Sequence, residues 1–197
     1  MQNIIYLYDP LCGWCYGASA GLAKLAADPQ NHIRLQATGL FSRSNRVMDA
    51  EFAGYAWAND QRIAQLTGLE FSEAYRRHVL ETPGAFDSWY LVQGMTAVAQ
   101  TAPERQLEML EKFQTARYVD GRQNAGKDTV AAILTENGLA EAAALLDTPD
   151  LTAAAEREIQ AGQALMRQHG LRGVPGLLVR ETDGGTWRVE DSGVLFA

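Results

Sequence analysis

Cysteine and histidine are scarce in this sequence, which has two cysteines and three histidines among its 197 residues. A structural zinc ion needs four ligands, so a single pair of cysteines would leave two of them to histidines. No two of these histidines stand at a spacing typical of zinc ligands; they are His32, His78 and His169. Four cysteines for an iron–sulfur cluster are not available within one chain. The composition therefore predicts no metal site.

Basic residues are outnumbered by acidic ones, 17 to 24, which gives a formal net charge of −7. A surface that binds nucleic acid or an anionic membrane normally needs a basic excess or at least a basic stripe. The nearest candidates, Arg43 with Arg46 and Arg76 with Arg77, are too sparse for this purpose. We therefore expect neither a nucleic acid nor a membrane among the partners.

Long hydrophobic runs are also missing. The apolar run near the start, Ile4–Tyr8, is followed at once by Asp9 and Pro10, and the residues before it carry no positive side chain. Secretory signals and membrane spans both need longer apolar segments. As written, the chain is expected to stay in the cytoplasm.

What remains is the composition of an ordinary folded protein, with 47% hydrophobic and 21% charged residues. Ile4–Tyr8 has the continuous apolar pattern of a buried strand, and residues from Cys15 to about Ala27 are helix formers. His32–Gly39 alternates apolar and polar side chains, which predicts a second strand. A strand, a helix and a strand in this order form a right-handed crossover, so the two strands should be parallel neighbours. The N-terminal part is therefore expected to be α/β.

Residues from about 50 to 170 are helical in pattern and contain no convincing strand. After Gly173 the pattern returns to strands, at 176–180 and 186–190. Asp183-Gly184-Gly185 between them is typical of a hairpin turn. The sheet is therefore expected to resume after a long helical excursion.

The two cysteines are Cys12 and Cys15, separated by Gly13 and Trp14. Random placement would give this spacing in about 1% of cases. At the start of a helix, residues i and i+3 lie close enough for their sulfurs to bond. Cys12 would be exposed at the helix start, where unpaired backbone N–H groups and the helix dipole favour a thiolate. We therefore expect Cys12 to be the attacking thiol and the more buried Cys15 to be the resolving thiol.

A purely structural role for this pair is disfavoured. A disulfide that closes so short a loop adds little stability, and in a cytoplasmic protein it would tend to be reduced. Dithiol–disulfide exchange needs no cofactor, because the two sulfurs carry the electrons. The motif predicts an enzyme without a cofactor whose partners are protein or peptide thiols and disulfides, with glutathione as a further candidate.

A second feature is Gly173-Val174-Pro175-Gly176, which directly precedes the apolar run at 177–179. A proline leading into a central strand is unusual, because it removes a hydrogen-bond donor from the sheet, and such positions often hold a cis peptide bond. Taken alone, an ordinary proline at a strand start is the simpler interpretation. Together with the upstream cysteine pair, the cis interpretation is favoured.

With these motifs at these places, the sequence resembles the thioredoxin superfamily, and within it the DsbA-like branch, which suggests a protein-disulfide isomerase type of enzyme. The resemblance covers nearly the whole chain. It implies an α/β fold in which a thioredoxin-like sheet carries a large inserted all-helical subdomain. The thioredoxin-like domain would comprise residues 1–45 and 171–197, and the inserted helical subdomain residues 46–170.

In that family the proline is cis and lies against the active-site cysteines, and the backbone before it binds extended substrate. The resemblance therefore implies a catalytic pair, Cys12 and Cys15, with Val174 and Pro175 as a substrate-facing wall. Trp14, between the cysteines, is expected to be largely exposed and is the preferred aromatic residue for substrate contact. Core packing is the favoured role for Tyr6.

Two departures from the family pattern affect the expected activity. The Gly13-Trp14 dipeptide lacks a histidine before the second cysteine, so one cationic stabiliser of the thiolate is missing. The reduction potential should therefore lie nearer that of thioredoxin, about −270 mV, than that of DsbA, about −120 mV. This favours reduction or isomerisation of disulfides over their formation. The chain also ends a few residues after its last predicted strand and leaves no room for the closing helix that thioredoxin folds usually carry; either this helix is absent or the natural C-terminus is longer.

Two other functions stay open at this point. A glutathione-dependent transferase or isomerase of the kappa type shares the helical insertion, but such enzymes usually have serine at the first motif position. A non-catalytic peptide-binding or chaperone protein would fit the helical block and the acidic surface. The presence of both Cys12 and Cys15 counts against each as the sole function.

Overall fold

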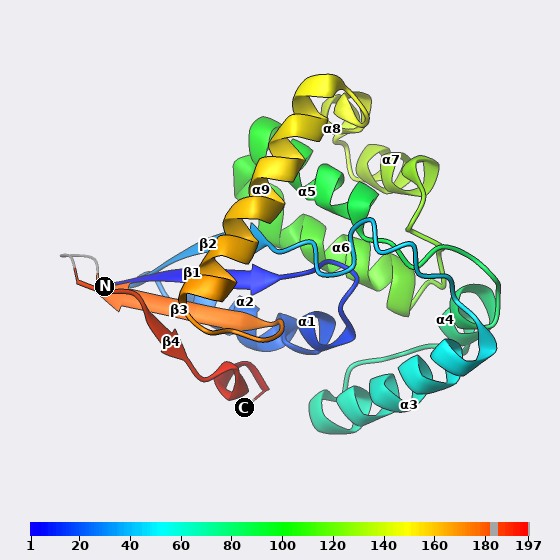
Figure 1. Ribbon diagram of the computed structural model, residues 1–197, viewed down its shortest axis with the longest axis horizontal. Coiled ribbons are helices and arrows are strands. Elements are labelled where there is room, and N and C mark those ends of the chain that lie inside the picture. The colour runs from blue at the N-terminus through cyan, green and yellow to red at the C-terminus, as the bar shows by residue number, and fades with distance from the viewer. Residues whose placement is uncertain (182–184, 197) are drawn as a thin grey trace.

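The protein is built around a mixed four-stranded sheet with strand order β2-β1-β3-β4 (Figure 1). The computed structural model describes residues 1–181 and 185–196. The strands are β1 (Gln2–Tyr8), β2 (Asn31–Ala37), β3 (Gly176–Glu181) and β4 (Arg188–Glu190). β1 pairs in parallel with β2 and antiparallel with β3. The predicted parallel neighbours are therefore confirmed.

Strands β3 and β4 pair antiparallel, with Leu178 opposite Val189. This confirms the C-terminal strand pair expected from the sequence. Of the predicted turn between them, Asp183 and Gly184 lie outside the described residues.

Two short helices follow β1, and a long series of helices separates β2 from β3. The first two are α1 (Gly13–Gly17) and α2 (Ser19–Ala27). The series comprises α3 (Ala50–Thr67), α4 (Glu73–Tyr75), the π-helical turn η1 (Arg76–Leu80), α5 (Trp89–Thr101), the 3₁₀ turn η2 (Pro103–Arg105), α6 (Gln106–Tyr118), α7 (Lys127–Glu136), α8 (Ala140–Leu145) and α9 (Pro149–Gln168). The fold is thus a thioredoxin-like sheet with a helical insertion, as predicted. Within this segment the strand-like pairing that the structure describes is one isolated bridge, between Val47 and Ala85.

The single helix predicted from Cys15 to about Ala27 is wrong in detail, because the structure divides it at Ala18. Helical hydrogen bonding nevertheless continues across the division. The Ala18 backbone N–H donates to the carbonyl of Trp14, and the Leu22 N–H donates to the carbonyl of Ala18. The helix also begins earlier than expected, at Gly13, so Cys12 is its N-cap residue and Cys15 lies in its first turn.

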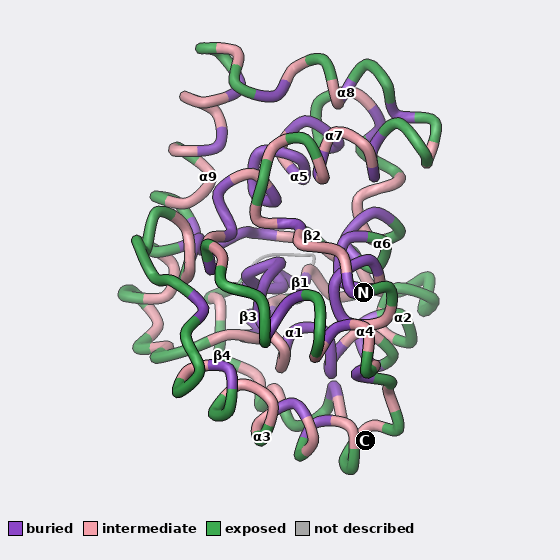
Figure 2. The backbone as a smooth tube through the Cα atoms, turned by 90° about the vertical axis from the view of Figure 1, so that its right-hand side faces the viewer, coloured by how far each residue is buried: buried purple, intermediate pink, exposed green. Residues whose placement is uncertain are grey.

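Strand β1 is buried on both faces, and its successive side chains point alternately into two separate apolar clusters. Ile4, Tyr6 and Tyr8 join the main core, which extends through α1, α2 and the helical block. Ile5 and Leu7 point the other way, into a smaller cluster with Leu178. Figure 2 shows β1 and β3 as largely buried segments near the centre of the molecule. The strand that leads into the cysteine motif is therefore held rigidly from both sides.

Helix α9 packs directly against the sheet. Its Leu165 and Met166 cover the smaller apolar cluster, and the Gln36 side chain of β2 donates a hydrogen bond to the Glu158 carbonyl. Gly162 permits this close approach, because a Cβ atom there would stand 2.3 Å from the Ala37 carbonyl oxygen. The last helix of the segment predicted as an inserted subdomain thus forms part of the sheet's own packing.

The last element that the structure describes is a 3₁₀ turn, η3 (Ser192–Phe196). This turn lies on α2, since a Cβ atom on Gly21 would stand 2.2 Å from the carbonyl oxygen of Leu195. Among the described residues, none of the helices combines the length and hydrophobicity that a bilayer crossing requires.

Candidate active site

Cys12 is the N-cap residue of α1 and lies against the loop that precedes β3. Its Sγ atom lies 3.7 Å from the backbone carbonyl oxygen of Val174, to which the thiol donates. The expectation that Cys12 is exposed is wrong, because only 7% of its surface is accessible. The backbone of Val174 therefore covers part of the Cys12 thiol.

Cys15 lies one turn further along the helix and is fully buried, as predicted, with 1% of its surface accessible. Burial, and then its hydrogen bond and charge interaction with Cys12, raise the pKa of the Cys15 thiol well above its ordinary value. Both cysteines are free thiols in the structure. The protonated form of Cys15 is therefore favoured over its thiolate.

The Val174–Pro175 peptide bond is cis, as the sequence motif suggested. Both residues are half-buried, and β3 begins immediately after them at Gly176. The fold therefore brings together three of the residue groups that the sequence selected: the cysteine pair, Val174 and Pro175.

Asp9 fixes the loop between β1 and the cysteine motif. Its carboxylate is completely buried and accepts three hydrogen bonds, from the backbone N–H of Leu11 (2.9 Å), the backbone N–H of Phe41 (3.0 Å) and the hydroxyl of Ser88 (2.8 Å). Burial raises the pKa of Asp9, while these three donors oppose that shift. The Asp9 side chain thus connects the loop that carries Cys12 to the loop after β2 and to the start of α5.

Helix α6 holds the same loop from the other side. The Tyr118 hydroxyl donates a 2.9 Å hydrogen bond to the carbonyl of Leu11, the residue before Cys12. The Tyr118 ring also stacks on Tyr16 at a centroid distance of 4.9 Å. The helical block therefore supports the position of Cys12 directly.

Trp14 is half-buried, which corrects the expectation that it is largely exposed. Its ring packs edge to face against Phe196 of η3, with 5.7 Å between the ring centroids. The C-terminal turn thus covers part of this side chain. Tyr6, as expected, is in the core, together with Tyr8 and Tyr16.

Gly13 faces helix α3, where it meets the carboxyl group of Asp60. A Cβ atom at Gly13 would stand 2.7 Å from Asp60 Oδ1 and 3.3 Å from Ile63 Cδ1. Asp60 is itself buried and accepts a 2.8 Å hydrogen bond from the Tyr75 hydroxyl. The dipeptide between the cysteines is thus in contact with an acidic side chain from the helical block.

Two cavities lie near these elements. One of about 270 Å³, between α2 and α6, is lined by Cys15 and by the buried Gln114, whose side-chain nitrogen has no hydrogen-bond partner. A larger one of about 450 Å³, between α3 and η1, has neither cysteine in its lining. In the described ranges no group of three or more histidine, cysteine, aspartate or glutamate side chains could hold a metal ion.

Sequence reasoning missed Asp9, Asp60 and Tyr118. Asp9 was used only as a strand terminator, although an acid directly after a buried strand and before a cysteine motif is itself a signal. Asp60 and Tyr118 are separated from the motif by tens of residues, and nothing in their local sequence points to it.

Comparisons with known proteins agree with this geometry. A family described as "DSBA-like thioredoxin domain" matches residues 3–192. The cytosolic disulfide reductase DsbM from Pseudomonas aeruginosa is 30% identical, with a TM-score of 0.86, and the match covers 98% of this chain and 91% of that one. The same reductase solved with GSH gives a TM-score of 0.84 at 30% identity, over 98% and 92% of the two chains.

A putative protein disulfide isomerase from Nitrosomonas europaea matches at 18% identity with a TM-score of 0.79, over 98% of this chain and 93% of that one. At this identity the likeness concerns the fold alone. A comparison with curated proteins found no significant match.

Proposed function

Because the chain belongs to the DSBA-like thioredoxin domain family, we propose that Cys12 and Cys15 are its redox pair and that they reduce or isomerise disulfides in protein or peptide substrates. The protein is a thiol–disulfide oxidoreductase. The observation that carries the assignment of residues is the contact between Cys12 Sγ and the Val174 carbonyl, with Cys15 buried one turn behind. In this proposal the Cys12 sulfur, beside the Val174 backbone, attacks the substrate, and the buried Cys15 sulfur reacts second.

The exchange proceeds in two steps. The Cys12 thiolate attacks one sulfur of a substrate disulfide, a Cys12–substrate disulfide forms, and the departing substrate sulfur takes up a proton. Cys15 then loses its proton and attacks the Cys12 sulfur, which releases the second substrate thiol and leaves a Cys12–Cys15 disulfide. The raised pKa of Cys15 keeps it from reacting first.

Glutathione is the proposed electron donor. Two glutathione thiols return the pair to the dithiol and form one glutathione disulfide, so electrons and protons balance. Support comes from the 30%-identical cytosolic reductase, whose structure has been solved with GSH. The same relative supports a reducing, cytoplasmic setting.

Val174, Pro175 and Trp14 are the proposed substrate-binding residues. The Val174 carbonyl already accepts from Cys12, the half-buried Pro175 directly follows Val174, and the half-buried Trp14 lies between the two cysteines in the chain. A kappa-type transferase and a non-catalytic chaperone are not favoured, because both cysteines lie in one helical turn and the 30%-identical relative is a disulfide reductase.

The test is reduction of insulin with glutathione as the reductant, followed by turbidity. We expect catalysis by the protein and none by Cys12→Ser. Equilibration with glutathione buffers should give a potential nearer about −270 mV than about −120 mV. A potential above about −150 mV would overturn the reductase direction.

A further inference from the structure

Asp60 is the buried acidic group of the helical block that touches the active-site turn. It lies on α3 with 4% of its surface accessible. Its Oδ1 atom occupies the space that a side chain at Gly13 would need, 2.7 Å from the ideal Cβ position. Gly13 directly follows Cys12, so the carboxyl group lies beside the backbone that carries the reactive sulfur.

The other neighbours of Asp60 stabilise its charge only weakly. From α4, the Tyr75 hydroxyl donates to Oδ2. From α6, the guanidinium of Arg117 lies 5.7 Å from the Tyr75 ring and 5.9 Å from the Tyr118 ring, and it donates to the side chains of Gln123 and Asn124. Within the described ranges Asp60 takes part in no ion pair shorter than 4 Å.

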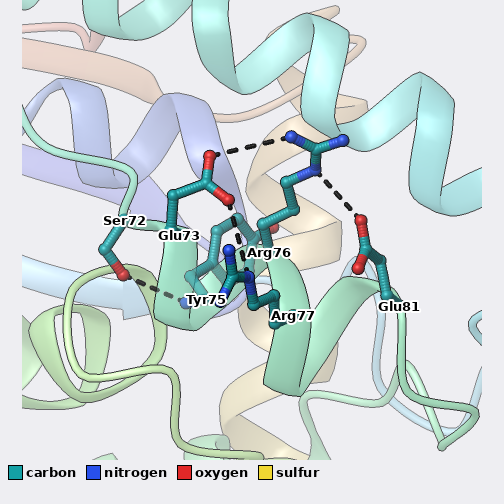
Figure 3. A network of polar contacts seen from close by, with 6 residues as sticks. All are labelled: Ser72, Glu73, Tyr75, Arg76, Arg77 and Glu81. Atoms are coloured by element: carbon teal, nitrogen blue, oxygen red, sulfur yellow. Dashed lines mark hydrogen bonds and ion pairs between the residues drawn. The ribbon is translucent and has the colours of Figure 1, made fainter.

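The donor to Asp60 is itself held in place (Figure 3). Ser72 Oγ accepts a 3.0 Å hydrogen bond from the Tyr75 backbone N–H, which caps the turn. Arg76, the next residue, lies between Glu73 and Glu81, at 3.7 and 3.0 Å. Tyr75 therefore presents its hydroxyl to Asp60 from a turn that these contacts hold in place.

Burial raises the pKa of Asp60 to about 7, and the Tyr75 hydrogen bond and the charge of Arg117 oppose that shift only in part. The charge of Asp60 therefore changes in the pH range in which thiol exchange normally runs. Tyr118 connects the surroundings of the two acids: its ring lies 5.0 Å from the ring of Tyr75, the donor to Asp60, and its hydroxyl donates to the carbonyl of Leu11, the residue before Cys12. Two negative charges in buried surroundings repel each other far more than they would in water.

We propose that Asp60 is a positioning residue whose charge, acting beside Gly13, sets the stability of the Cys12 thiolate and hence the reduction potential of the cysteine pair. This rests on the proposed function of Cys12 and Cys15. When two electrons reduce the Cys12–Cys15 disulfide, the S–S bond breaks, Cys12 leaves as a thiolate and Cys15 takes up a proton. Above neutral pH the reduced state also draws a proton onto Asp60, because the new thiolate and the carboxylate repel each other.

The test is the equilibrium between the cysteine pair and dithiothreitol redox buffers at pH 6 and pH 8, for the wild type and Asp60→Asn. At pH 8 the variant lacks the repelling carboxylate, so its reduced form should be favoured about tenfold, or about 30 mV for this two-electron couple. At pH 6 the two proteins should differ by less than about twofold, because Asp60 is then mostly neutral. The matched control is Glu51→Gln, which removes an exposed carboxylate from the same helix and should match the wild type at both pH values.

Equal potentials for the wild type and Asp60→Asn at pH 8 would overturn the proposal. If the asparagine variant does not fold, Tyr75→Phe provides the test instead. Loss of the hydroxyl donor should raise the pKa of Asp60, so the pH at which the slope of the reduction potential against pH changes should move to a higher value. If this pH does not move, the proposal is overturned. Failure of insulin reduction by the wild type would count against the proposed function alone, because the potential in dithiothreitol buffers is measured without any protein substrate.

Discussion

The backbone carbonyl of Val174 lies 3.7 Å from the Sγ atom of Cys12, although 162 positions separate the two residues in the chain. The contact exists because β1 and β3 are hydrogen-bonded neighbours, with Leu7 opposite Gly176. The loop after β1 and the loop before β3 therefore meet at one edge of the sheet. Substrate exchange is expected at this meeting point.

The two cysteines should differ in what they trap. Cys15→Ser should accumulate mixed disulfides with oxidised peptide, because Cys12 can still attack and no resolving thiol follows. Cys12→Ser should trap essentially none, since Cys15 is buried and held as a thiol. Non-reducing gels and intact mass measure both. Equal trapping by the two variants would show that the roles are assigned wrongly.

Asp60 should make the free energy of unfolding depend on pH. Its folded pKa of about 7 lies above the ordinary value of 3.8, so the folded state binds more protons between these values. The stability it contributes is present below pH 4 and is lost as the pH rises through 7, by on the order of 4 kcal/mol. Urea unfolding of the wild type and Asp60→Asn from pH 4 to 8 measures this difference.

The asparagine variant should therefore gain stability relative to the wild type as the pH rises. Two other acids with raised pKa values, the buried Asp9 and the half-buried Glu158, remain in both proteins and cancel in the comparison. Glu51→Gln again serves as the control and should run parallel to the wild type. A constant difference between wild type and Asp60→Asn across this range would contradict the prediction.

Replacing Asp9 should loosen the loop that carries Cys12. In Asp9→Asn an NH₂ group replaces one carboxylate oxygen. This group cannot accept a hydrogen bond, so at least one of the three donors around residue 9 loses its acceptor. The substitution should lower the free energy of unfolding by about 2–3 kcal/mol. Ser88→Ala, which removes only one of these hydrogen bonds, should cost about 1 kcal/mol. Urea midpoints and the rate of Cys12 alkylation report the two effects. If both variants behave alike, the carboxylate is not the anchor of the loop.

Two helical glycines should respond oppositely to alanine. Gly162→Ala should destabilise the protein by about 1–3 kcal/mol, because its Cβ would meet the backbone carbonyl of Ala37 at 2.3 Å. Gly54→Ala, on α3 with no atom within 4 Å of its Cβ position, should stabilise it by about 0.5–1 kcal/mol. Thermal and urea unfolding measure both. A Gly162→Ala protein as stable as the wild type would mean that α9 packs less tightly on the sheet than described.

Local patterns were sufficient for the fold class and for the proximity of the two cysteines. Alternation in residues 32–37 and the continuous apolar run at 4–8 predict strands, because side chains of a strand face opposite sides in turn. The spacing of Cys12 and Cys15 predicts their proximity, because helix geometry alone brings i and i+3 together. The cis bond before Pro175 was favoured because two motifs agreed, and neither would have sufficed alone.

Accessibility could not be obtained in this way. Cys12 and Trp14 were expected to be exposed because nothing nearby in the sequence covers them. In the fold they are covered by Val174 and by Phe196, more than 160 positions away. The burial of a residue depends on what packs against it, and the residues that pack against it can be far away in the sequence.

The sequence by itself determined the fold class, the redox chemistry and the order of its elements, since hydrophobic periodicity and motif spacing act over a few residues. Only the tertiary structure decided that Asp9, Tyr118 and Asp60 converge on the loop and turn around Cys12. These side chains come from β1's end, α6 and α3, and their convergence depends on how the helical block docks on the sheet. A carboxyl group's charge depends on its solvation and its neighbours. For Asp60 both are set by docking, which no local pattern in the chain encodes.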